Sequence, residues 1–204
     1  DDLPATIYTA MLTTAQGQDG HPGDLVQTTA AGLDLLPANI ELSQAELDLT
    51  REPLGIYALR DCLKPLARKY DFVLLDCPPS LGILTTNALA AATEVVIPLQ
   101  ADYLALKGVD LLLSTIGKIQ KRANTKLTVA GILLTMADTR TLHAREVIEA
   151  ANVAFGERVP IFKTVVHASV RLKEAPLAGQ SILVYAGESA GAEAYRALAK
   201  EIEP

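Results

Sequence analysis

Short apolar runs alternate along this chain with longer stretches in which apolar residues recur every three or four positions. The runs lie at residues 72–75, 95–99, 127–135 and 159–166, and they are rich in Val, Ile and Leu. Such runs are typical of strands that are buried on both faces of a parallel sheet. We expect helices between them, at residues 54–69, 83–92, 109–122, 141–155, 169–174 and 189–202. This alternation predicts an α/β fold, a three-layer sandwich whose mostly parallel central sheet is flanked by helices.

The amino-terminal part is less regular. Residues 1–12 have roughly helical spacing, whereas residues 13–23 are polar and glycine-rich, which indicates an exposed loop. Two short strands are expected at residues 25–28 and 32–37, and Ser43 is a plausible amino-terminal cap for a helix that runs through Leu49. Farther along, the helix at 109–122 has an inward face formed by Leu111, Leu112, Ile116 and Ile119.

The segment at residues 70–82 organises the rest of the chain. It combines the apolar run at 72–75 with Asp76 at its carboxyl end, where open α/β sheets bind their ligands. Pro78 and Pro79 end the strand, because proline cannot continue a ladder of hydrogen bonds. A carboxylate in this place suits an Mg²⁺ ion reached through water, but it also suits an aspartate that merely caps a core strand. Spacing alone leaves both interpretations open.

Composition bounds the fold and the partners. At 204 residues, half of them hydrophobic and few aromatic, the chain is long enough for one domain with an aliphatic core, and we expect a single domain over residues 1–204. The net charge of −6 argues against a general coat of positive charge but leaves room for a local basic patch. Cys62 and Cys77 have no Cys-x-x-Cys spacing, which suggests neither a disulfide framework nor a zinc site. The sequence shows no signal peptide and no apolar run long enough to span a membrane. We therefore expect a cytoplasmic protein that does not have a membrane as a partner.

Five segments resemble the ParA/Soj-type partition ATPases, the deviant-Walker branch of the P-loop NTPases within the MinD/ParA superfamily. Residues 70–82, Tyr-Asp-Phe-Val-Leu-Leu-Asp-Cys-Pro-Pro-Ser-Leu-Gly, resemble the Walker B and switch II segment of that family. The others follow in the family's order, at residues 96–109, 131–141, 170–176 and 191–202. The resemblance covers most of the chain from about residue 30 onward and implies a P-loop NTPase-like fold.

The family's P-loop is missing from the sequence. Neither Gly-x-x-x-x-Gly-Lys-Ser/Thr nor Lys-Gly-Gly-x-Gly-Lys-Thr occurs anywhere, although such a loop supplies the backbone amides and the lysine that hold phosphates. In the family, the P-loop strand and helix precede the first segment found here. We therefore interpret the chain as a ParA-like ATPase domain that is amino-terminally incomplete, without the first strand and the P-loop helix.

The resemblance also implies a nucleotide site for ATP or ADP with Mg²⁺. Asp76 corresponds to the Walker B acid in the Mg²⁺ shell, and Pro78 and Pro79 open switch II, which senses the γ-phosphate. Thr135 and Met136 correspond to part of the adenine pocket, although Met136 also suits a filler of a core gap. The loop at residues 166–169 departs from the usual Ile-Pro-Arg-Asn, which leaves His167 as a candidate to stack on the base or as an ordinary surface residue.

Four basic residues are candidates for DNA binding by the same resemblance: Arg140, Arg171, Lys163 and Lys173. The family binds DNA without sequence preference as an ATP-bound homodimer, and counterion release lets a few cations per protomer suffice. The alternative for any one of them is a solvated surface charge.

The function implied is ATP-driven partition of DNA, with hydrolysis stimulated by a ParB-like partner and the protein associated with the nucleoid. A MinD-like ATPase that cycles on a membrane is a second interpretation, but it needs a basic amphipathic tail, whereas residues 197–204 are short and acidic. A third is a non-enzymatic binding or dimerisation module without a P-loop.

Overall fold

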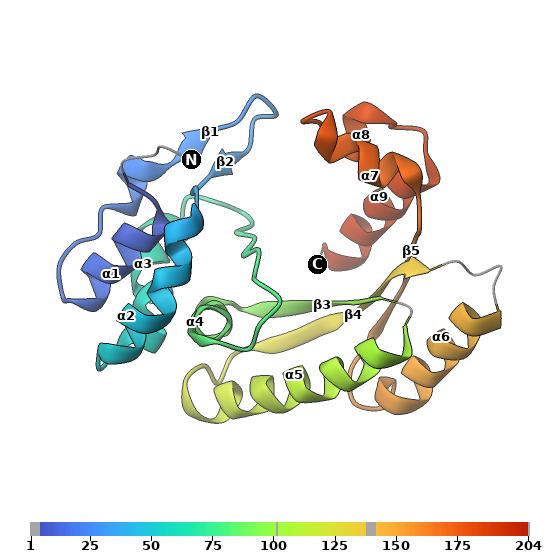
Figure 1. The fold of residues 1–204 in the computed structure, drawn as a ribbon, viewed down its shortest axis with the longest axis horizontal. Coiled ribbons are helices and arrows are strands. Elements are labelled where there is room, and N and C mark those ends of the chain that lie inside the picture. The colour runs from blue at the N-terminus through green and yellow to red at the C-terminus, as the bar shows by residue number, and fades with distance from the viewer. Residues whose placement is uncertain (1–4, 101, 138–141, 204) are drawn as a thin grey trace. The chain divides into compact units, whose positions relative to one another are not determined.

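The computed structural model describes residues 5–100, 102–137 and 142–203. The chain divides into two compact units (Figure 1). Unit 1 consists of Asp1–Thr93 and Thr115–Leu127, and unit 2 consists of Glu94–Ser114 and Thr128–Pro204.

Unit 1 is built mainly from helices. Its helices are α1 (Ile7–Ala15), α2 (Ala45–Arg51), α3 (Ala58–Ala67), α4 (Ile83–Ala91) and the second half of α5 (Tyr103–Arg122). Single 3-10 turns lie at η1 (Pro22–Leu25), η2 (Ile40–Gln44) and η3 (Gly55–Tyr57), and an exposed antiparallel hairpin joins β1 (Gln27–Thr28) to β2 (Asp34–Leu35). Apolar side chains from α1 to α4 form the core, among them Met11, Leu49, Leu59 and Ala88.

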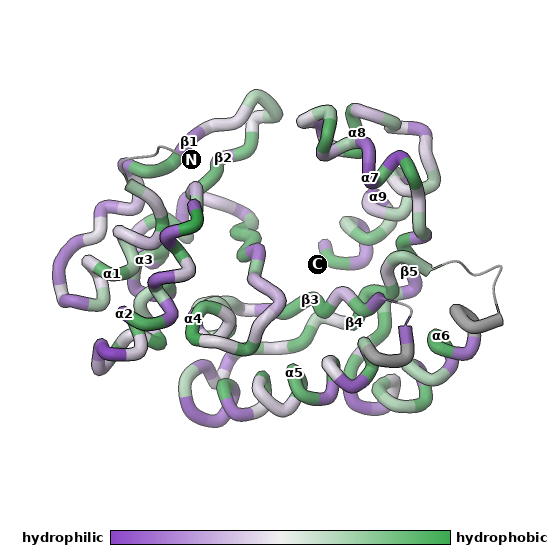
Figure 2. Tube along the Cα trace, viewed as in Figure 1, coloured by the Kyte–Doolittle hydropathy of each residue, from purple (hydrophilic) through white to green (hydrophobic). Residues whose placement is uncertain are grey.

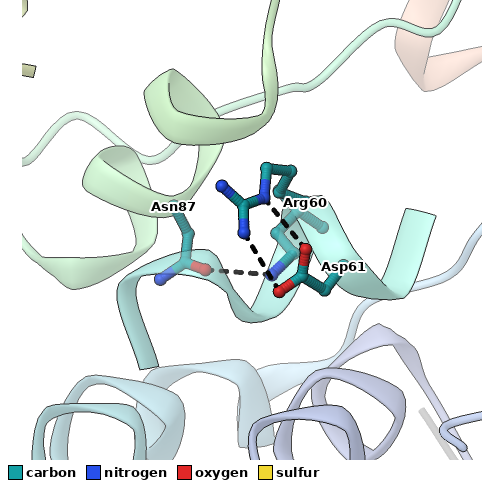
Figure 3. Close-up of polar contacts among 4 residues, drawn as sticks. Arg60, Asp61 and Asn87 are labelled. Atoms are coloured by element: carbon teal, nitrogen blue, oxygen red, sulfur yellow. Dashed lines mark hydrogen bonds and ion pairs between the residues drawn. The ribbon is translucent and has the colours of Figure 1, made fainter. Parts of the chain in front are cut away.

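A buried amide connects the turns and helices of unit 1. Asn87 of α4 has no exposed surface, and its Oδ1 accepts a hydrogen bond from the Leu59 N–H at 3.0 Å (Figure 3). Its Nδ2 donates to the carbonyl oxygens of Gly55, at 2.9 Å, and of Ile83, at 3.1 Å. Gly55 is required for close packing, because a Cβ there would lie 1.8 Å from the Leu49 carbonyl oxygen. These contacts fix α4 against η3 and α3.

Unit 2 contains a three-stranded parallel sheet in the order β3-β4-β5, formed by Glu94–Gln100, Thr128–Ala137 and Ile161–His167. Helices α6 (Leu142–Phe155) and α9 (Ala190–Ile202) lie on opposite faces of this sheet (Figure 1). The short helices α7 (Val170–Leu177) and α8 (Ile182–Tyr185) connect β5 to α9. The predicted α/β class with a parallel sheet between helices is confirmed, and so are the predicted strands at 95–99, 127–135 and 159–166.

The outer strand β5 is bulged, and a helix side chain binds the bulge. Ile132 pairs with Ile161 and Leu134 pairs with Val165, so the segment at 162–164 is longer than the stretch of β4 opposite it. Glu201 of α9 accepts hydrogen bonds from the backbone N–H groups of Lys163 and Thr164, each at 2.9 Å, and from the Thr164 hydroxyl. The hydrogen bond from the Thr164 hydroxyl is the largest influence that, together with the two backbone amides, holds the pKa of Glu201 below its ordinary value. The Glu201 carboxylate thus accepts hydrogen bonds from backbone N–H groups that would otherwise be exposed on an edge strand.

The expected strand at residues 72–75 is wrong. The segment between α3 and α4 is extended but joins no ladder, and part of it is apolar (green in Figure 2). The side chains of Phe72, Val73 and Leu74 are exposed, with Leu74 92% exposed. A parallel strand is stabilised by hydrogen bonds to neighbouring strands, and the part of the chain that the structure describes places none beside this segment. Apolar content alone was therefore not sufficient for a strand.

Two smaller expectations are corrected. Ser43 lies inside η2 and donates to the Ile40 carbonyl oxygen, whereas Asn39 caps that turn by accepting a hydrogen bond from the Glu41 N–H at 3.1 Å. Leu111 is exposed and does not belong to the buried face of α5, although Ile116 and Ile119 are buried as expected.

Replacement of Asn87 tests the polar connection in unit 1. We expect Asn87→Ala to lower the free energy of unfolding by about 3 kcal/mol, because it leaves the Leu59 N–H and the Gly55 carbonyl buried without this partner. Urea denaturation followed by circular dichroism measures the change. Thr86→Ala is the matched control, since the Thr86 hydroxyl bonds only to the Gly82 carbonyl one turn earlier. A loss no larger than that of the control would contradict this role.

Glu201 gives a prediction about pH. Because its pKa in the folded chain lies below the ordinary value of 4.5, its stabilisation is complete above about pH 4.5 and is lost as the pH falls through the folded pKa. We expect Glu201→Gln to lower the midpoint of urea unfolding at pH 7 and to reduce the further loss of stability in acid. Glu203→Gln, at the exposed end of the same helix, is the control. Equal acid dependence in wild type and Glu201→Gln would refute the assignment.

Candidate functional site

A hollow of about 440 Å³ lies in unit 1, beside the segment that follows the extended residues 72–75. Two stretches of chain form its walls. One wall comes from η2, its cap and the start of α2, and the other from residues 76–84. The lining residues are Asn39, Ile40, Leu42, Ser43 and Glu46 on the first wall and Asp76, Cys77, Pro78, Ser80 and Leu84 on the second.

Hydrogen bonds fix the segment that carries Asp76 at both of its ends. At the amino-terminal end, the Tyr70 hydroxyl donates to Asp34 Oδ2 of the β1–β2 hairpin at 2.8 Å. The Thr28 hydroxyl donates to the other oxygen of Asp34, and these two bonds lower the pKa of that carboxyl group. At the other end, the Thr85 hydroxyl of α4 donates to the Ser80 carbonyl oxygen at 2.5 Å. Asp76 lies between these fixed points.

The charge of the hollow favours a cation. Asp76 and Glu46 line it from opposite walls, and none of its ten described lining residues is Lys or Arg. Carboxylate and hydroxyl oxygens, here from Asp76 and Ser80, are ligands that Mg²⁺ accepts. In the part of the chain that the structure describes, no group of three or more His, Cys, Asp or Glu side chains is arranged around a common point. A cation in this hollow would thus take most of its ligands from water or from a bound molecule.

The carboxyl ends of β4 and β5 form a second polar region, in unit 2. Thr135 is half-buried in β4, and Met136 follows with a φ of +51°, a left-handed conformation that costs free energy for any residue except glycine. Met136 is also 62% exposed, so the interpretation that it fills a core gap is wrong. Strained backbone that exposes a large side chain at the ligand edge of a parallel sheet is typical of a binding site.

His167 and Ala137 join the ends of these two strands. The Ala137 carbonyl oxygen accepts hydrogen bonds from the Ala168 N–H, at 3.3 Å, and from His167 Nδ1, at 3.1 Å. A carbonyl oxygen can only accept, so Nδ1 donates the proton in this contact. The ring is thereby held at the strand ends beside Met136.

The basic candidates that the structure describes are exposed, and one of them is paired with a carboxylate. Arg171 of α7 is exposed and pairs with Glu174 at 3.2 Å, and Glu174 also accepts a hydrogen bond from the Tyr185 hydroxyl. Lys173 lies two residues after Arg171, which directs the two side chains to different sides of the helix. Lys163 is exposed on the β5 bulge, and Arg140 lies outside the described residues.

One wall of the hollow was not predicted from the sequence. Pattern and resemblance pointed to Asp76 and Pro78, but Asn39 and Glu46, thirty or more residues earlier, line the same hollow. Pro79 is exposed and is absent from the lining. The signal available in the sequence was the group of polar residues Asn39, Ser43 and Glu46, of which the capping pattern singled out only Ser43.

None of the helices in the described part of the chain combines the length and the continuous apolar character that crossing a bilayer requires.

Comparison with known proteins identifies relatives along nearly the whole chain. A family model described as an AAA domain matches residues 2–129. The sporulation initiation inhibitor protein Soj of Bacillus subtilis (strain 168) is 45% identical over 202 residues, which are 98% of this chain and 77% of that protein. The chromosome-partitioning ATPase Soj of Treponema pallidum (strain Nichols) is 45% identical over 183 residues, 89% of this chain and 72% of that protein.

A solved structure supports the same grouping. Cobyrinic acid a,c-diamide synthase from Mycobacterium smegmatis, crystallised with a bound ATP analog and magnesium, matches with a TM-score of 0.82 and 34% identity, over 98% of this chain and 72% of that one. The expected family is confirmed by the family model, which matches more than half of the chain, and by relatives of this identity and coverage. The chain therefore belongs to the ParA/Soj family of P-loop ATPases.

Proposed function

We propose that this protein is a ParA-type partition ATPase, with residues 1–204 belonging to one ATPase domain. It binds ATP with Mg²⁺, dimerises in the ATP-bound state, binds DNA without sequence preference and releases it after hydrolysis. The observation that carries the proposal is the hollow beside Asp76, which combines a Walker B-like carboxylate with switch II in a chain 45% identical to partition proteins. A ParB-like partner stimulates hydrolysis, and the protein is cytoplasmic and associated with the nucleoid.

In this proposal each residue that the resemblance implies for nucleotide or Mg²⁺ keeps that role. Asp76 holds the Mg²⁺ shell through water, and residues 78–82 respond to the γ-phosphate. Bound Mg²⁺ neutralises phosphate charge, which favours transfer of the phosphoryl group. Thr135, Met136 and His167 contact the base. Neither P-loop pattern occurs in the 204 residues, so this proposal assigns none of them to the phosphates.

DNA binding is assigned to Arg140, Arg171, Lys163 and Lys173. Two copies in a dimer double the number of cations that displace counterions from DNA, so a few exposed side chains per protomer suffice. Glu174 neutralises part of the charge of Arg171 in the free chain, and this pair must open when a phosphate takes its place.

The membrane-cycling interpretation is less well supported. Leu198 of α9 packs with Leu133 of β4 and Val166 of β5, and Glu201 of the same helix binds the β5 bulge. The apolar face that a membrane-binding helix would need is therefore covered by the sheet. The third interpretation, a non-enzymatic module, differs in its dependence on nucleotide. Such a module would bind its partners equally with and without ATP.

The test is binding of the intact protein to a labelled DNA duplex of arbitrary sequence, with and without ATP and Mg²⁺. We expect binding only with both, and we expect Arg171→Ala to weaken it by roughly three- to tenfold and to lower the dependence of log K on log salt concentration by about one to two per dimer. Glu174→Gln should tighten binding, because it removes the competing carboxylate.

Lys200→Ala is the matched control, because Lys200 is an exposed cation of α9 in the same unit that is not assigned to DNA. DNA binding that is independent of ATP, or an Arg171→Ala variant that behaves like Lys200→Ala, would contradict the proposal.

A further inference from the structure

We infer that Glu46 is a positioning residue for switch II, and that its carboxylate holds the junction between Gly82 and α4 in place. The contact itself is independent of the proposed function, whereas its effect on Mg²⁺-nucleotide rests on that function. Glu46 lies in the first turn of α2, and Gly82 is the amino-terminal cap of α4. Glu46 lines the hollow, and Gly82 lies between its lining residues Ser80 and Leu84 in the sequence.

Distance, and not backbone conformation, explains the glycine at position 82. Its φ of −75° and ψ of −167° are open to every residue type, so no turn requires glycine there. A Cβ on Gly82 would instead lie 2.2 Å from Glu46 Oε1 and 3.2 Å from its Cδ. The absence of a side chain at 82 therefore provides the space that the Glu46 carboxylate occupies.

The partial positive charge at the amino-terminal end of α4 makes a nearby carboxylate favourable. The first amides of a helix lack intrahelical partners and carry partial positive charge, which a cap residue normally satisfies with a side-chain oxygen. Gly82 has no such oxygen, and α4 has no acidic residue in its first turn. Glu46 brings a negative charge from α2 to this end of the helix.

Helix α2, which carries Glu46, and helix α4, which Gly82 caps, are both held in place by contacts within unit 1. Leu49 of α2 is buried in the core of unit 1, and the Asp48 carboxylate accepts a hydrogen bond from the Tyr8 hydroxyl of α1 at 2.7 Å. On the other side, Asn87 holds α4 against α3 and η3. Movement of the Gly82 junction shifts the segment that carries Asp76, six residues earlier. Loss of Glu46 should consequently weaken the hold on Mg²⁺ without unfolding the chain.

The experiment compares Glu46→Ala, Gly82→Ala and the double variant in the intact protein. The Glu46 carboxylate ends a flexible side chain, so an alanine at 82 moves it aside and leaves the fold intact. One readout is hydrogen exchange of the amides at residues 83–85 without nucleotide. The second is the Mg²⁺ concentration that gives half-maximal binding of a fluorescent ATP analogue.

We expect each single variant to speed exchange of these amides, and to raise the required Mg²⁺ concentration, by roughly two- to fivefold. The double variant should match either single one, because both remove the same contact. Glu46→Gln should resemble Glu46→Ala, since the negative charge carries the effect. Glu52→Ala, which removes a carboxylate at the other end of α2 away from the hollow lining, should behave as wild type with a similar melting temperature.

Three results would overturn the inference: unchanged exchange in Glu46→Ala, additive effects in the double variant, or wild-type behaviour of Glu46→Gln. If exchange responds as expected but wild type binds no Mg²⁺-nucleotide, the positioning contact stands and the proposed function fails. If wild type binds Mg²⁺-nucleotide and exchange does not respond, the proposed function stands and the inference about Glu46 fails.

Discussion

The buried amide of Asn87 is the interaction on which the arrangement of unit 1 depends. It satisfies one backbone donor and two backbone acceptors from three stretches of chain, and no apolar side chain of similar volume can do this. Its position sets where α4 begins, and the start of α4 sets where the segment at residues 76–82 ends. The geometry of Asp76 is therefore determined partly by an amide eleven residues later in the sequence.

The two units share a physical logic, although their cores differ. In each, a candidate functional segment lies at the end of a regular element and is held by polar contacts from other parts of the chain. Residues 76–82 of unit 1 are bounded by the Tyr70–Asp34 contact and by the start of α4. In unit 2 the end of β4 is bound to β5 through the Ala137 carbonyl, and Met136 keeps a strained conformation there. Such polar contacts fix side-chain positions where packing alone would leave them loosely defined.

The sequence predicted what local pattern determines and failed where distant residues decide. The strands β3, β4 and β5 follow from apolar runs and helix α9 from its helical spacing, and these elements lie as expected. Residues 72–75 have equal apolar character, but a strand needs neighbours, which no local pattern supplies. The same holds for Glu46, because its neighbour Gly82 is distant in the sequence and close only in the fold. Helix α8 was missed because four residues are too few for a periodic signal.

We propose that the hollow beside Asp76 is the cation part of a nucleotide site. The most direct measurement is a titration of the intact protein with a fluorescent ATP analogue at varied Mg²⁺ concentrations. We expect wild type to bind the nucleotide more tightly as the Mg²⁺ concentration rises. Asp76→Asn keeps the shape of the side chain and removes its charge, so it should lose most of this Mg²⁺ dependence. Nucleotide binding that is indifferent to Mg²⁺, or an Asp76→Asn variant with the Mg²⁺ dependence of wild type, would contradict it.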